Sequence, residues 1–190
     1  IARALCLLVL AALAASHARA QDTSAPSYRI SYTLSMPEPA SHLFDVRVDV
    51  EGLAGAEHVD FQMPRWSPGR YAVFDFAKNV QDFSVTGSAG NPIRWDKTTG
   101  SRWRIHSGAA RSFRVSYRVF ANAPMSGTFS ALDTLHANWN GPSIFMYVEG
   151  HKQDPVTLTV NAPDGWTIIN GEVDRPGQRA PPTAVFPRQH

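Results

Sequence analysis

The sequence predicts an all-β fold, an antiparallel β-sandwich of about nine or ten short strands preceded by a signal peptide. Three observations support this prediction. Apolar and polar residues alternate in many short runs, which is the period that turns one face of a strand toward a core. Clusters of Gly, Pro, Asn and Asp separate these runs at the ~8–12-residue spacing of sandwiches and barrels. The chain of 190 residues shows no convincing amphipathic helix and no internal repeat.

Residues 1–20, IARALCLLVLAALAASHARA, are expected to be a secretory signal peptide. Arg3 supplies the positive start, and the apolar run that follows is too short to span a bilayer. Ala18-Arg19-Ala20 has the small-x-small pattern of a cleavage site. We therefore expect cleavage before Gln21 and an exported mature protein, either periplasmic or secreted.

Cleavage would leave a mature chain that is formally neutral and free of cysteine. Removing Arg3 and Arg19 reduces the eighteen basic residues to sixteen, which equals the sixteen acidic residues. This balance argues against nucleic acid and against an anionic membrane as partners. The single cysteine, Cys6, lies within the signal, so the mature domain must be held together by its core rather than by disulfides.

The expected strands follow one another along residues 21–171, which form the β-domain. In most of these strands apolar residues recur at every second position, as Tyr28, Ile30 and Tyr32 do in the first. The predicted strands cover residues 28–36, 44–50, 59–63, 83–85, 93–95, 103–105, 113–120, 144–148, 156–160 and 166–169. The sequence DKTTGS between Trp95 and Trp103 is typical of a hairpin loop.

Three segments do not follow this alternation. Residues 144–148, IFMYV, are continuously apolar and predict a central strand covered on both faces. Residues 131–139, ALDTLHANW, are the only segment of the predicted domain whose sequence could form a helical turn or two. Residues 172–190 are rich in Pro, Arg and Gly without periodicity, which indicates a linker or an unstructured tail.

The residues show no clear catalytic or metal-binding pattern. The mature histidines lack metal-ligand spacing, and no HExxH or HxH occurs among them: His42, His58, His106, His136, His151 and His190. The sequence MSGTFSALDTLH contains Ser126, Ser130, Asp133 and His136, so a catalytic triad stays open, although a turn at Ser126 and a cap at Asp133 explain these residues more simply. We expect neither a catalytic residue nor a metal ligand in this chain.

Two further residue types could serve a function. Glu149 ends the most apolar strand and is a candidate carboxylate for glycosidase chemistry, while the turn at Gly150 is its structural explanation. Five tryptophans could stack on sugars or fill a core, and two of them, Trp66 and Trp139, lie in loop-like sequence.

Three stretches together resemble the N-terminal domain of the glycyl-aminopeptidase family of zinc metallopeptidases, metallopeptidase family sixty-one. The stretches are YRISYTLSMPEPASHLFDVRVDVEGL, VDFQMPRWSPGRYAVFDFAKNVQDFSV and NWNGPSIFMYVEGHKQDPVTLTVNAPDGWTI. The resemblance covers roughly Tyr28 to Gly171. The resemblance is mainly to bacterial proteins. It implies that a thermolysin-like catalytic domain carries the zinc, on an HExxH helix, and that the present sequence stops before this domain.

The resemblance also suggests a role for the PRWSPGRY stretch. Pro64, Pro68 and Gly69 predict a rigid corner, with a type II turn at Pro68-Gly69. From this corner we expect projecting side chains of the types that anchor interfaces. The candidate residues for the interface with the catalytic domain, or for the border of its substrate site, are Trp66, Arg70, Tyr71, Trp139, Asn140 and Glu149.

Two alternatives remain at this stage. A free-standing secreted module that binds carbohydrate or peptide would expose coplanar tryptophans. A small independent hydrolase would hold Ser, Asp and His, or two carboxylates, around a real pocket.

The function that the sequence and the resemblance together predict is that of the non-catalytic N-terminal β-domain of an exported zinc aminopeptidase. Its expected partners are the catalytic domain and peptide substrate at the border between the two domains, and its own residues are expected to hold no cofactor.

Overall fold

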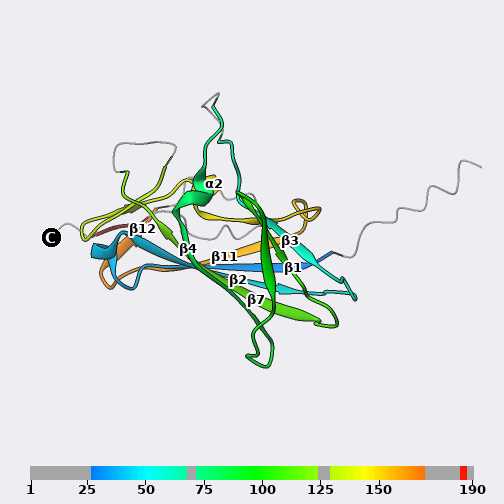
Figure 1. Cartoon of the computed structure of the whole chain (residues 1–190). Coiled ribbons are helices and arrows are strands. Elements are labelled where there is room, and N and C mark those ends of the chain that lie inside the picture. Colours follow the sequence, from blue (N-terminus) through cyan, green and yellow to red (C-terminus); the bar gives the residue numbers. More distant parts are fainter. Residues whose placement is uncertain (1–26, 68–71, 124–128, 170–184, 188–190) are drawn as a thin grey trace, which may run out of the picture.

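The computed structural model describes residues 27–67, 72–123, 129–169 and 185–187. These residues form a mostly β architecture of three sheets and no closed barrel, with thirteen strands and three short helical segments (Figure 1). The all-β expectation is therefore confirmed, with more strands than the nine or ten predicted. Residues 1–20, expected as a signal peptide, lie outside the described residues.

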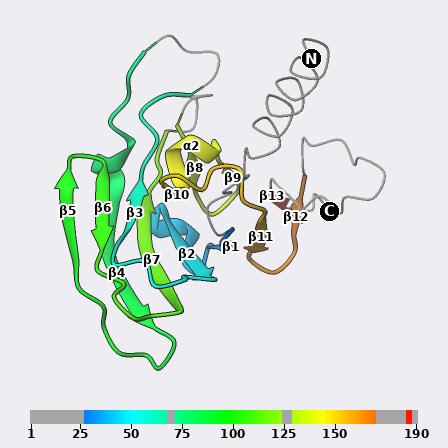
Figure 2. The ribbon, with the colours of Figure 1, turned by 90° about the vertical axis from the view of Figure 1, so that its right-hand side faces the viewer.

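Sheet A contains five strands, and sheet B contains four. The order in sheet A is β11 (Val156–Asn161), β1 (Arg29–Ser35), β2 (Leu43–Glu51), β7 (Ser112–Phe120) and β4 (Val80–Gly87). The order in sheet B is β10 (Tyr147–Val148), β3 (Val59–Gln62), β6 (Arg102–Ile105) and β5 (Trp95–Thr99). Figure 2 shows β5, β6 and β3 of sheet B side by side.

Sheet C and the helical segments are smaller. Sheet C has the order β12 (Trp166–Ile168), β13 (Val185–Pro187), β9 (Ala137–Asn138) and β8 (Ala131–Leu132). The helical segments are η1 (Pro39–Ser41), η2 (Phe76–Asn79) and α2 (Gly141–Ile144). Within the described part of the chain, no helix is long and apolar enough to cross a membrane.

The core lies between sheets A and B. Along β2 and β7 every second residue is buried, which is the alternation that the sequence predicts. Aromatic rings bridge the two sheets: Phe61 of β3 lies 6.1 Å from Phe113 of β7, and Phe83 of β4 stacks 5.5 Å from Trp103 of β6. Contacts of this kind make one shared apolar core out of two sheets.

Two tyrosine hydroxyls fix the segment that connects α2 to β10. The buried Tyr117 hydroxyl donates a hydrogen bond to the Ile144 carbonyl oxygen (3.0 Å) and accepts one from the Met146 N–H (3.0 Å). The Tyr32 hydroxyl donates to the Met146 carbonyl oxygen at 2.9 Å. These bonds supply backbone partners where neither helix nor sheet does.

The structure corrects the predictions for residues 144–148 and 131–139. Only Tyr147 and Val148 form a strand, because Pro142 starts a helical turn that ends at Ile144. The apolar run is buried because side chains from this irregular segment enter the core, not because a long strand is covered on both faces. Residues 131–139 form the β8–β9 hairpin instead of a helical turn, closed by Asp133 Oδ1, which accepts the N–H groups of Leu135 and His136.

The sandwich is not wholly antiparallel, because β11 pairs with β1 in parallel over six residue pairs. The remaining pairings between neighbouring strands are antiparallel.

Within the expected tail, residues 185–187 form β13 between β12 and β9. The other residues of that stretch lie outside the described part of the chain.

A small clasp holds the start of β1 against the loop before β11. The Tyr28 N–H donates to Asp154 Oδ2 at 2.6 Å, and His151 Nδ1 donates to the same oxygen at 2.8 Å. The rings of Tyr28 and His151 stack with centroids 3.7 Å apart. The Tyr28 N–H, followed by His151, holds the pKa of Asp154 below its ordinary value of 3.8.

We predict that Tyr117→Phe lowers the free energy of unfolding by about 1–3 kcal/mol, since it leaves a buried carbonyl oxygen and a buried N–H without their partner. Urea unfolding followed by circular dichroism measures this change. Tyr147→Phe, at a half-buried position of β10, is the matched control and should change stability much less. Equal effects of the two substitutions would contradict a special role for Tyr117.

We also predict that the clasp loses its contribution in acid. Because the pKa of Asp154 is lower in the folded protein than in the unfolded chain, its stabilisation is complete above the ordinary carboxyl pKa and disappears as the pH falls through the folded value. The difference in stability between wild type and Asp154→Asn should therefore shrink as the pH falls below about 4. Urea midpoints of both proteins across this range provide the measurement, and a constant difference would contradict it.

Candidate functional site

The most exposed aromatic feature of the described chain is the loop that follows β3. We call its described residues, 64–67 and 72–75, the corner loop. Figure 1 shows these two segments rising together away from the sheets, and the Phe74 N–H donates to the Arg65 carbonyl oxygen at 2.8 Å. The predicted turn at Pro68-Gly69 and the candidates Arg70 and Tyr71 lie outside the described residues.

The two arms of the corner loop carry exposed apolar side chains. Trp66 is 52% exposed, and Val73 on the opposite arm is 71% exposed. Tryptophan is among the residue types that most often anchor interfaces. Trp66 thus projects from the corner loop, and its role as an interface anchor stays a prediction.

Aromatic packing supports the base of the corner loop. Phe74 stacks on the buried Phe76 of η2 with ring centroids 5.3 Å apart. Phe129 meets both rings edge-on, at 5.6 Å from Phe74 and 5.4 Å from Phe76. Three rings in these orientations hold the returning arm of the loop by burial and by favourable ring geometry.

A buried polar network holds the other arm. Asn140 Nδ2 donates to the hydroxyl oxygen of the buried Ser67 at 2.7 Å. The Asn140 N–H donates to Ser130 Oγ (3.0 Å), and Ser130 Oγ lies 2.7 Å from Ser143 Oγ. Ser143 Oγ in turn donates to the Asn140 carbonyl oxygen at 2.9 Å. The structure thus links two of the predicted site residues, Asn140 and Trp66, because Asn140 binds Ser67, which follows Trp66 in the chain.

Trp139 has a supporting rather than an exposed position. Its half-buried ring meets the ring of Phe44 edge-on, with centroids 6.2 Å apart. Of the five tryptophans, all within the described residues, Trp66 is the exposed one, whereas Trp95, Trp139 and Trp166 pack partly against the core and Trp103 is buried. The coplanar exposed tryptophans expected of a sugar-binding module are not present.

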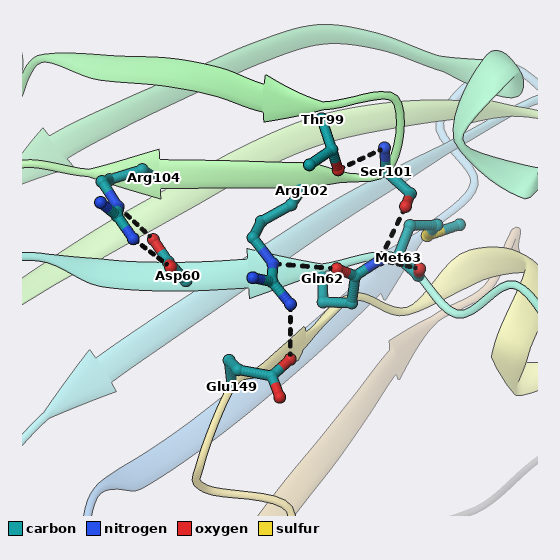
Figure 3. Close-up of polar contacts among 8 residues, drawn as sticks. All are labelled: Asp60, Gln62, Met63, Thr99, Ser101, Arg102, Arg104 and Glu149. Atoms are coloured by element: carbon teal, nitrogen blue, oxygen red, sulfur yellow. Dashed lines mark hydrogen bonds and ion pairs between the residues drawn. The ribbon is translucent and has the colours of Figure 1, made fainter.

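Glu149 lies apart from the corner loop, beside the outer face of sheet B (Figure 3). Its carboxylate is 3.5 Å from Arg102 Nη2, and Arg102 Nε donates to Gln62 Oε1 at 3.1 Å. On the same face Arg104 forms a two-pronged bond to Asp60, both distances being 2.8 Å, which lowers the pKa of Asp60. Figure 3 shows Glu149 directed at an arginine rather than at a second carboxylate, so the pair needed for glycoside hydrolysis is not formed there.

The serine, aspartate and histidine of residues 130–136 do not form a triad. His136 Nδ1 lies 3.2 Å from Asp133 Oδ1, but Ser130 is buried and its hydroxyl bonds to Ser143 and Asn140 instead. Ser126 lies outside the described residues. Among the residues that are described, no group of three or more His, Asp or Glu could hold a metal ion. The side chains present therefore do not fit a zinc ion, and we derive no reaction step through one.

Sequence reasoning missed the role of the buried serines and of Phe129 in supporting the corner loop. Ser67, Ser130 and Ser143 come from three separate segments and meet only in the folded chain. One local signal was available: Asn140 precedes Gly141-Pro142, which is typical of the residue before a helical turn. It identifies Asn140 as a boundary residue, although not as the partner of Ser67.

The sequence defines an N-terminal domain of a peptidase, because a family profile of that class matches most of the chain. A solved structure of an aminopeptidase N family protein from Idiomarina loihiensis has a similar fold, with a TM-score of 0.68 and 23% sequence identity. The match covers 83% of the present chain and 26% of that protein, so the chain spans about a quarter of its length. The sequence then assigns the family: the chain belongs to the Peptidase M61 N-terminal domain family, whose sequence profile matches residues 31–178.

A second solved structure, an M1 zinc metallopeptidase from Deinococcus radiodurans, is a more distant match. It has a TM-score of 0.41 and 15% identity, and it covers 85% of this chain and 39% of that one. Comparison with curated protein sequences found no significant match.

We predict that Ser67→Ala loosens the corner loop without unfolding the domain, because it removes the hydroxyl that receives Asn140 Nδ2. Hydrogen exchange within residues 64–76 should accelerate, while the loss of global stability stays near ~1 kcal/mol. Ser107→Ala is the matched control, since Ser107 is equally buried and its hydroxyl donates to the Ala56 carbonyl oxygen at 2.6 Å, away from the loop. Equal exchange in both variants would show that the network does not order the loop.

Proposed function

We propose that this chain is the non-catalytic N-terminal β-domain of an exported zinc aminopeptidase and that it packs against the catalytic domain of the same polypeptide. The main support is the family assignment over residues 31–178, together with the small share of the related structure that the chain covers. Export, to the periplasm or the medium, is part of the proposal and rests on the composition of residues 1–20.

The corner loop is the proposed contact with the catalytic domain. Trp66 and Val73 stand exposed on arms whose bases are held by the serine–asparagine network and by a cluster of three aromatic rings. A contact surface that is ordered before binding loses little conformational entropy on docking. Substrate at the domain border would then meet the same loop, with Trp66 as the residue that it touches first.

The chemistry of the parent enzyme is assigned to its catalytic domain. Zinc would polarise the scissile carbonyl and activate water there. The residues of the present chain would orient that domain and shape the entrance to its active site. In this proposal the isolated chain hydrolyses no peptide.

We predict that Trp66→Ala leaves the isolated domain folded but weakens its association with the catalytic domain supplied in trans by about tenfold or more, the scale of an interface hot spot. Calorimetric titration measures the association, and circular dichroism checks the fold. Leu135→Ala is the control, because Leu135 is 70% exposed at the tip of the β8–β9 hairpin. Unchanged affinity in Trp66→Ala would exclude the corner loop as the contact.

A further inference from the structure

The edges of the three sheets are protected to different degrees. An edge strand exposes unpaired N–H and C=O groups, and proteins usually guard it with charges, bulges, proline or short length. On β4 a bulge between Gln81 and Ser84 interrupts the ladder, and Asp82 there pairs with Arg118. On β5 a bulge follows the charged Lys97. The outer strands β8, β10 and β12 are only two or three residues long.

Strand β11 has none of these protections. Its six residues, VTLTVN, include no charge and no proline. It follows β1 without a bulge, from Ile30 opposite Val156 to Ser35 opposite Asn161. In sheet A it is the terminal strand, and no described strand pairs with its other side. Among the described edge strands, it is therefore the one that is long, regular and uncharged.

The outer face of sheet A also loses its charge toward this edge. On the central strands β2 and β7 charged pairs are dense, as in Arg114 with Asp49 at 2.7 Å. On β11 the outward residues are Thr157, Thr159 and Asn161, and the first and last of these bond to serine hydroxyls of β1 at 3.0 Å. A strand added here would meet small uncharged polar groups on this face.

The inner face at the same edge is apolar and incompletely covered. Val156 is 57% exposed, and Leu158 and Val160 pack only partly against the core. No residue between Glu149 and Ile169 is buried, in contrast to the strands of the central sheet. The edge thus combines open backbone groups with apolar surface that a further strand would cover.

We propose that β11 pairs antiparallel with β11 of a second copy of this chain, about a two-fold axis at Leu158, so that two A sheets become one continuous sheet. This register is self-complementary. It places Leu158 opposite Leu158 and Val156 opposite Val160 on the inner face, and Thr157 opposite Thr159 on the outer face. Apolar and Thr–Thr cross-strand pairs are both favourable.

The flanking charges permit this arrangement. In the same register Asp154, which precedes β11, falls opposite Ala162 of the second copy, so no like charges meet across the axis. A single interface that is its own complement closes after two copies and does not propagate into a fibre. The pairing uses none of the corner loop, so the inference is independent of the proposed function.

Sedimentation velocity over a concentration series tests the proposal with the whole chain. The wild type should form a concentration-dependent dimer, and Thr159→Lys should remain monomeric, because the two-fold axis brings two lysines to one short stretch of the new sheet. Thr99→Lys, at the end of the edge strand β5, is the matched control and should still dimerise. A monomeric wild type, or a dimer that Thr159→Lys leaves intact, would overturn the proposal.

A cross-link then checks the register. On a Cys6→Ser background the chain has no other cysteine, so one introduced thiol can form only an intermolecular disulfide. Leu158→Cys should cross-link under mild oxidation, since the axis places the two thiols opposite each other. Val156→Cys should not, because its opposite residue is Val160. Equal cross-linking of both variants, or higher assemblies in place of a dimer, would rule out the two-fold pairing.

Discussion

The arrangement of the candidate interface depends on the two tyrosine hydroxyls that hold residues 144–146. Tyr117 and Tyr32 occupy strands of sheet A, and through the Ile144 carbonyl and both backbone groups of Met146 they fix a segment that has no ladder of its own. Burial raises the pKa of Tyr32 to about 12 and raises that of Tyr117 further. Both phenols therefore stay protonated, and thus remain donors, throughout the physiological pH range.

This constraint extends from the core to the surface in a few steps. The fixed segment carries α2, whose first turn follows Asn140, and Asn140 bonds to Ser67 at the base of the corner loop. A substitution in the core at Tyr117 would therefore alter the presentation of Trp66 without touching it. Buried polar groups that satisfy one another in this way make a local structure unique, because any rearrangement leaves a donor or acceptor unpaired.

Residue alternation was enough to predict the paired strands but not their partners. It located β1, β2, β3 and β7, since each presents one face to the core. It also located β11, although not its parallel pairing, which depends on a contact across more than a hundred residues. It failed at residues 144–148, where hydroxyls of tyrosines distant in the sequence replace a ladder. Of the candidate site, the exposed Trp66 followed from its rigid, loop-like surroundings. The serine–asparagine network could not be predicted, because its members are neighbours only after folding.

The two surfaces of the domain differ in the kind of contact they can make. The corner loop offers a few protruding side chains on a braced base, which suits a pocket or cleft in a differently shaped partner. The β11 edge offers regular backbone groups flanked by small, uncharged side chains, which suits another strand of the same kind. The corner loop leads from β3 of sheet B through η2 to β4, and β4 and β11 are the opposite edges of sheet A. Because neither contact uses residues of the other, one copy can engage a catalytic domain through the corner loop while pairing with a second copy through β11.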